Sequence, residues 1–161
     1  MADIDAELID LAAKYSRDPR GWVDMAYDWG HGELAGFNGP RDWQGAIFDE
    51  IGNHLQGPGR HQPLLVAVSS GHGIGKSAGI GMIINWALST CEDCKVVVTA
   101  NTEGQLRTKT SPEIGKWQRL SITSHWFDPQ SASVSSKDKD HTKTWRADMV
   151  PWSDNNTEAF A

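Results

Sequence analysis

The segment that most constrains the fold is the glycine-rich stretch Ser69–Ser77, with the sequence Ser-Ser-Gly-His-Gly-Ile-Gly-Lys-Ser. It follows the apolar run Leu64–Val68 directly, and the run Ala78–Leu88 after it has the composition of a buried helix. A strand, a glycine-rich turn and a helix in this order are typical of α/β proteins in which the turn presents successive backbone N–H groups to an anion. The sequence therefore predicts a phosphate-binding loop here.

Each residue type in the predicted loop has a chemical reason. The glycines permit close approach of the backbone to a phosphate and φ angles that a Cβ disfavours. Lys76 is expected to contact the β- and γ-phosphates as the catalytic cation, and the Ser77 hydroxyl to bind Mg²⁺. The loop residues expected to contact the nucleotide are Ser70, Gly71, His72, Gly73, Ile74, Gly75, Lys76 and Ser77.

The loop departs from the strict pattern at one place. Ser70 stands where that pattern has a glycine, six residues before the lysine. His72 is expected to fill a variable position of the loop rather than to take part in chemistry. The competing interpretation is a glycine-rich turn that only caps an ordinary helix.

Composition limits what the chain can do. Its 161 residues are about one domain's worth, and a formal net charge of −6 argues against a free-standing protein that binds duplex DNA. No apolar run approaches the about 18 residues of a membrane span, so we expect a cytoplasmic protein without membrane contact. Cys91 and Cys94 have no further zinc ligands at suitable spacing, and we expect them in a plain turn.

Hydrophobic periodicity predicts the other elements. The expected helices cover residues 4–15, a short piece from Asp18, 41–55, 76–89, a piece from Thr102 to about residue 108, and 112–120. The expected strands cover 64–68, 95–100 and, as a strand or hairpin arm, 142–150, and residues 30–40 form a loop. This order predicts an α/β fold with a largely parallel sheet and ligands beyond the carboxyl ends of its strands.

Three more segments, taken with the loop, resemble one protein family. Gly39–Gln44 precedes the loop by about one helix, and Val98–Leu106 and Trp152–Phe160 follow it. Together they resemble the N-terminal ATPase region of the large terminase subunits of tailed phages, motors that package DNA into capsids. The resemblance implies a RecA- or helicase-like P-loop NTPase fold, three layers αβα, with an incomplete parallel sheet. Residues 1–38 would be an N-terminal helical segment and linker, and residues 39–161 a partial ATPase domain.

The resemblance also implies roles and partners. Trp43 and Gln44 would recognise adenine, the amide contacting the base edge and the ring packing near it; the alternative is that Trp43 is a core anchor of its helix. Residues 99–102 would lie near DNA, or would simply end a strand and cap a helix. The implied cofactors are ATP and Mg²⁺. The implied partners are double-stranded DNA, the small terminase subunit, the portal protein and further copies of the chain on the portal, in the cytoplasm of a bacterial host.

ATP hydrolysis needs carboxylates, and the sequence lacks the strand that supplies them in the family. In the family an apolar strand ending in Asp-Glu binds Mg²⁺ and activates water, and no such run follows Val98. The stretch Met149–Asp154 is too short, and its Pro151 argues against a central strand. The family's C-terminal nuclease domain is absent from the 161 residues too.

We therefore expect the chain alone to bind ATP without cleaving it. In the family's sheet, later strands lie between the two strands predicted at 64–68 and 95–100, so we also expect exposed apolar edges and poor stability. Two other interpretations stay open. One is a different P-loop enzyme, such as a helicase-like ATPase or a small-molecule kinase. The other is a degenerate prophage remnant that holds a nucleotide and never hydrolyses it.

Overall fold

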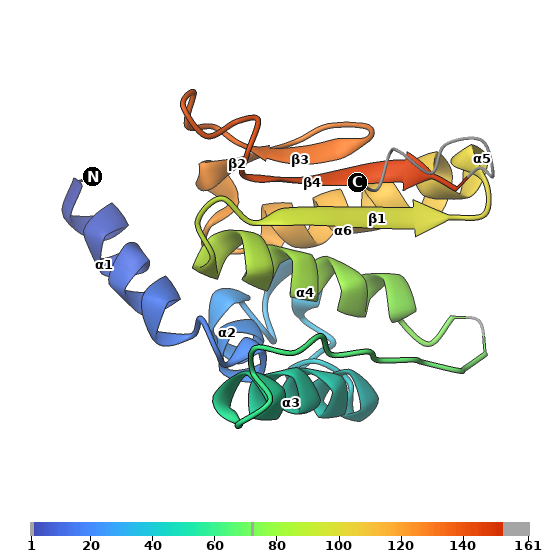
Figure 1. Cartoon of the computed structure of the whole chain (residues 1–161), viewed down its shortest axis with the longest axis horizontal. Helices are drawn as coiled ribbons and strands as arrows, with labels where there is room; N and C mark the ends of the chain where they lie inside the picture. The colour runs from blue at the N-terminus through green and yellow to red at the C-terminus, as the bar shows by residue number, and fades with distance from the viewer. Residues whose placement is uncertain (1, 72, 153–161) are drawn as a thin grey trace.

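The structure is a computed structural model, and it describes residues 2–71 and 73–152. Helices and strands are concentrated in two regions, helices at the N-terminal end and a sheet toward the C-terminal end (Figure 1). The helices are α1 (Ala2–Lys14), α2 (Pro19–Ala26), η1 (Gly32–Leu34), α3 (Asp42–Gln56), α4 (Lys76–Thr90), α5 (Glu103–Gln105), η2 (Leu106–Thr110), α6 (Ser111–Leu120) and η3 (Ser124–Trp126). The strands are β1 (Lys95–Ala100), β2 (Phe127–Pro129), β3 (Ser133–Ser136) and β4 (Arg146–Pro151).

The described strands form one mixed sheet in the order β1-β4-β3-β2. Only β1 and β4 run parallel, with Val97 opposite Asp148, whereas β3 is antiparallel to both of its neighbours. The prediction of an α/β chain is confirmed, and the prediction of a largely parallel sheet is wrong for the described residues. The cause is the pair of short strands β2 and β3, which the sequence analysis missed.

Helices α4 and α6 cover one face of the sheet (Figure 1). In β1 the alternate residues Val96 and Val98 pack against a core that includes Leu88 of α4 and Ile114 of α6. Val97, which points to the other face, is 51% exposed. In the described residues helices thus pack on one face of the sheet, whereas the expected αβα arrangement has them on both faces.

The segment predicted as a strand at 64–68 is not a strand in the structure. It runs as an extended trace in front of α4 and α3 (Figure 1), and no ladder within the described residues includes it. Leu65 is 93% exposed, while Val66 and Val68 line an apolar groove between α3 and α4. The apolar composition was correctly noted, but a strand also needs a neighbouring strand to pair with.

Strand β4 corrects the expectation that Pro151 excludes a central strand. β4 lies between β1 and β3, and Pro151 is its last residue, opposite Ala100. The pairing with β3 ends at Asp148, so the proline lies beyond the part of β4 that is hydrogen-bonded on both sides. A proline is tolerated there because the missing N–H would have no partner in β3.

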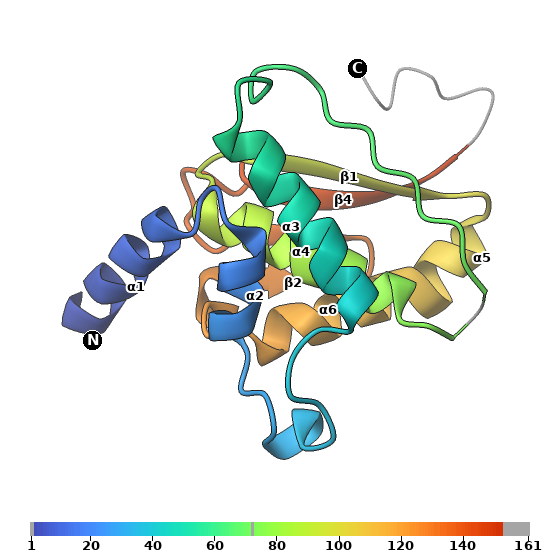
Figure 2. The ribbon, with the colours of Figure 1, turned by 90° about the horizontal axis from the view of Figure 1, so that it is seen from below.

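A second core joins the N-terminal helices to α4 and α6. Trp22 of α2 lies at its centre, fully buried, with Phe48 of α3 and Met82 of α4 around it. Helix α2 begins as predicted, with Pro19 in its first turn and the Asp18 carboxylate accepting from Gly21 N at 2.9 Å. This core fixes α3 beside α4 (Figure 2).

The helical region 103–120 is more continuous than predicted. Thr102 Oγ1 accepts from Gln105 N at 3.1 Å, which confirms the predicted cap. The chain then passes through a π-helical turn, Leu106–Thr110, directly into α6, so the predicted break before residue 112 is a change of helix type. Within residues 2–71 and 73–152, no helix is both long and apolar enough to cross a lipid bilayer.

Candidate functional site

The glycine-rich loop leads into the N-terminus of α4, as predicted. Gly73 and Gly75 have φ angles of +75° and +87°, in the left-handed region that a side chain disfavours. Helix α4 begins at Lys76, so its dipole points its positive end toward the loop. His72, one of the residues expected to contact the nucleotide, lies outside the described residues.

The Lys76 side chain folds back over the loop. Its ammonium group donates to the carbonyl oxygens of Ser70 at 3.0 Å and Gly71 at 2.8 Å, and to the Ser70 hydroxyl at 3.2 Å. The positive charge is thus held at the mouth of the loop by exposed partners that an incoming anion can replace. Ser77 follows in the first turn of α4 and is half-buried.

Helix α3 supports the loop through its first turn. The indole N–H of Trp43 donates to Ile74 O at 3.2 Å. Gln44 Nε2 donates to Gly75 O at 2.7 Å, while its Oε1 accepts from Arg41 N at 2.8 Å. The structure thus brings both predicted adenine-recognition residues to the loop across 31 positions of sequence, and the role in adenine recognition stays a prediction.

A pocket of about 190 Å³ opens beside the loop, which we call the aromatic pocket. One wall is the loop itself, at Gly73 and Gly75, and Gln44 lies next to it. The other walls are largely apolar, and the remaining lining residues are Trp29, Leu34, Phe37, Gly39, Pro40, Arg41, Ala78, Met82, Glu113, Lys116 and Trp117. An apolar pocket that adjoins a glycine-rich loop with a lysine ammonium group is suited to a ligand with one flat apolar end and one charged end.

The walls of the aromatic pocket are held in place by neighbouring contacts. Trp29 and Trp117 lie with ring centroids 5.9 Å apart, and each donates its indole N–H, to Val23 O and to the Glu113 carboxylate. Phe37, by contrast, is 49% exposed at the rim. The pocket therefore has a fixed inner wall and an open edge.

Trp29 and Phe37 were not among the residues predicted for the site. Both belong to the region around the predicted loop 30–40, whose glycines indicated only an irregular segment. The available signal was the presence of large aromatic residues in a polar, glycine-rich stretch, where a packed core alone does not require them.

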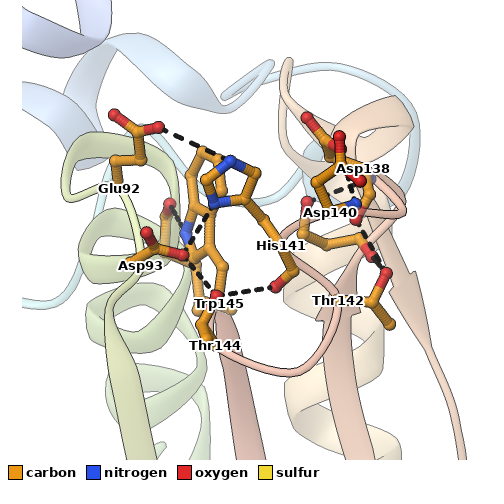
Figure 3. Close-up of polar contacts among 10 residues, drawn as sticks. Glu92, Asp93, Asp138, Asp140, His141, Thr142, Thr144 and Trp145 are labelled. Carbon is orange, nitrogen blue, oxygen red and sulfur yellow. Dashed lines mark hydrogen bonds and ion pairs between the residues drawn. The ribbon is translucent and has the colours of Figure 1, made fainter.

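The Cys91–Cys94 turn lies away from the loop, at the other end of α4. Cys91 follows α4 and Cys94 precedes β1, so the two cysteines lie in a turn between helix and strand, as predicted. Within it, Asp93 has a φ of +56° and accepts hydrogen bonds from Thr144 Oγ1 and from His141 Nδ1, the latter at 2.8 Å (Figure 3).

The potential ligand atoms of Glu92, Asp93 and His141 lie within 4.8 Å of one another, and neither cysteine belongs to the group. The hydrogen bond to the Asp93 carboxylate raises the pKa of His141, and the nearby carboxylates of Asp138 and Glu92 raise it further, while desolvation opposes them. This interaction already accounts for the cluster without a metal ion.

Comparison of the chain with protein-family models, with curated proteins and with solved structures found no match.

Proposed function

We propose that this chain binds ATP with Mg²⁺ through the loop Ser70–Ser77, as the N-terminal ATPase portion of a phage DNA-packaging motor of the large terminase type. In the full-length motor ATP hydrolysis would drive double-stranded DNA into a capsid. The small terminase subunit, the portal protein and further copies of the chain would be its partners, in the cytoplasm of the bacterial host. The 161 residues alone would hold the nucleotide without cleaving it.

One observation carries the nucleotide-binding part of this proposal, the position of Lys76. Its ammonium group is bound to exposed oxygens of Ser70 and Gly71, beside two glycines in the left-handed region and at the start of a fifteen-residue helix. A cation and the positive end of a helix dipole at the same place favour the binding of an anion. When ATP binds, the Lys76 ammonium group would exchange its hydrogen bonds to Ser70 and Gly71 for contacts with the γ-phosphate. The Ser77 hydroxyl would bind Mg²⁺.

The open side of the sheet supports the resemblance to packaging motors. β1 is one of the two edge strands of the described sheet, and Val97 on its uncovered face is half-exposed. In the view of Figure 2 the extended segment 64–68 and β1 both lie above α4. Leu65 is exposed, and Val66 and Val68 line the groove of α3 and α4. Further strands between 64–68 and β1, as in the family's sheet, would pair with the open backbone edges of both segments.

The test is a calorimetric titration of the purified chain with ATP in the presence of Mg²⁺. Lys76→Ala removes a charge-assisted hydrogen bond to phosphate, worth about 1.5–3 kcal/mol, and should weaken binding by about 10- to 100-fold. The matched control is Lys139→Ala, since Lys139 is exposed in the loop before β4 and should leave the affinity unchanged. Equal affinity of the wild type and Lys76→Ala for ATP would contradict the phosphate-binding role of the loop.

A further inference from the structure

We propose that Trp43 and Gln44 are positioning residues that hold the phosphate loop in its binding shape, and that the nucleotide base lies in the aromatic pocket against Phe37 and Trp29. This inference rests on the proposed function, since it concerns how the same nucleotide is held. It differs from the role that the resemblance implies, in which Gln44 itself contacts the base.

The side chain of Gln44 is already committed within the protein. Its oxygen accepts from Arg41 N at 2.8 Å and its nitrogen donates to Gly75 O at 2.7 Å, and the residue is only 3% exposed. Nε2 keeps a second N–H and Oε1 a second lone pair, but a residue this deeply buried presents neither to a ligand, so contact with a base edge would require the side chain to leave these bonds. Leaving a buried polar group unpaired is costly, so the observed bonds favour a role in the loop.

The ring of Trp43 lies in the groove between α3 and α4. Its indole N–H donates to Ile74 O, and its ring lines the apolar groove between α3 and α4 together with Ile47 and Ile80. It does not line the aromatic pocket. The ring of Trp43 therefore packs in the groove, while its indole N–H binds the loop.

The two hydrogen bonds from α3 orient the donors of the loop. In a trans peptide the C=O of one residue and the N–H of the next point in opposite directions. Because Trp43 and Gln44 bind the carbonyls of Ile74 and Gly75 toward α3, the N–H groups of Gly75 and Lys76 must point away from α3. Gly75 O is held a second time, by Gly79 N at 3.0 Å, as the first hydrogen bond of α4. Side chains of α3 thus aim backbone donors at the place of the phosphates.

The aromatic pocket has the shape and lining for the base. Its volume of about 190 Å³ is below the about 300–1,000 Å³ of pockets that enclose a whole drug-sized ligand, so it suits one part of a nucleotide. Gly73 and Gly75 in its wall make it continuous with the phosphate loop. The ring of Phe37 at the open rim and that of Trp29 in the wall offer faces on which a base can stack.

The experiment compares ATP with inorganic tripolyphosphate, which has the phosphates without the base, in Mg²⁺-containing buffer by calorimetry. Trp43→Phe keeps a ring in the groove and removes one hydrogen bond to the loop. This substitution should weaken the binding of ATP and of tripolyphosphate by the same factor, about 2- to 10-fold. Gln44→Ala should do the same, and Trp43→Phe decides the question if Gln44→Ala does not fold. Phe37→Ala should weaken the binding of ATP by at least about 5-fold and leave the affinity for tripolyphosphate unchanged.

The outcomes separate this inference from the proposed function. If Trp43→Phe weakens the binding of ATP and leaves the affinity for tripolyphosphate unchanged, Trp43 contacts the base and the positioning role is wrong. If Phe37→Ala leaves the affinity for ATP unchanged, the base does not lie in the aromatic pocket. A wild-type chain that binds neither ligand, with Lys76→Ala indistinguishable from it, contradicts the proposed function itself.

Discussion

The indole N–H of Trp22 donates to Asn85 Oδ1 at 3.0 Å, and both side chains are fully buried between α2 and α4. Asn85 in turn donates through Nδ2 to Gln118 Oε1 of α6, also at 3.0 Å. One carboxamide in the middle of α4 therefore connects three helices that are distant in sequence. It also fixes the rotation of α4, and with it the direction in which Lys76 leaves the helix.

Asn85→Ala should destabilise the protein by about 2–6 kcal/mol, because it leaves the Trp22 indole N–H and the Gln118 oxygen buried without a partner, at about 1–3 kcal/mol each. The measurement is the free energy of unfolding in urea. Asn53→Ala is the matched control, since Asn53 is exposed on α3 and its removal should change stability by less than about 0.5 kcal/mol. Similar losses for the two variants would contradict the buried network.

Alanine substitutions at Gly81 and Gly115 should change the stability of the protein in opposite directions. A Cβ on Gly81 of α4 would lie 2.9 Å from Cδ1 of Trp117, a ring held between Tyr27 and Trp29, so Gly81→Ala should cost about 1–3 kcal/mol. A Cβ on Gly115 of α6 would meet only Pro129 at 3.8 Å, and Gly115→Ala should gain about 0.5–1 kcal/mol from helix propensity. Thermal unfolding of both variants checks the pair, and a loss at Gly115 equal to that at Gly81 would contradict the close contact.

Gly75 is the position in the loop where a side chain is least tolerated. Its φ of +87° and the 3.1 Å distance from a built Cβ to Gln44 Nε2 predict that Gly75→Ala lowers stability by about 1–2 kcal/mol. Gly71→Ala should leave the stability of the ligand-free protein unchanged, because Gly71 is outside the left-handed region and faces open space. Urea unfolding of both variants without nucleotide is the measurement, and equal stability would show that α3 does not constrain Gly75.

The hydrogen bond between His141 and Asp93 predicts a pH dependence of stability (Figure 3). The pKa of His141 is raised above its ordinary value of 6.5, so the stabilisation is fully present below pH 6.5 and is lost as the pH rises through the raised pKa. The pKa of Asp93 is lowered from 3.8 by hydrogen bonds from Thr144 and then His141, so its contribution is lost only as the pH falls through that lowered value.

The pair should therefore stabilise the fold most between about pH 4 and 6.5. The melting temperature of His141→Gln should fall furthest below that of the wild type in this window, and the difference should shrink as the pH rises above it. His61→Gln, in an exposed loop, provides the control. A constant difference between wild type and His141→Gln across the pH range would show that the charge on His141 plays no part.

The sequence predicted those elements whose signal is local. The start of α4 at Lys76, strand β1 and the cap at Thr102 each follow from a few adjacent residues, and the structure has all three. Strands β2 and β3 were missed because Ser133–Ser136 looks polar in sequence, although all four residues are buried in the sheet. Small hydroxyl side chains can be buried where their hydrogen bonds are satisfied, which composition alone does not reveal.

The candidate site was predictable to a similar extent. The loop and Lys76 follow from one contiguous motif, whereas the bonds from Gln44 to Gly75 and Arg41 depend on α3 lying beside α4, which is decided by the core around Trp22. For the extended segment 64–68, the apolar sequence did not predict the structure. An apolar sequence specifies that a segment prefers to be covered, but not which strand covers it.

The aromatic rings around the pocket also give the molecule an optical property. The centroid of Tyr27 lies 5.7 Å from that of Trp29 and 5.2 Å from that of Trp117, and the two indoles are tilted by 42°. Electronic transitions of rings this close couple to one another, and the resulting circular-dichroism band depends on the angle between the rings. A ligand whose own ring lies against Trp29 would couple to the same transitions and thus change the near-ultraviolet circular-dichroism spectrum of the unlabelled protein.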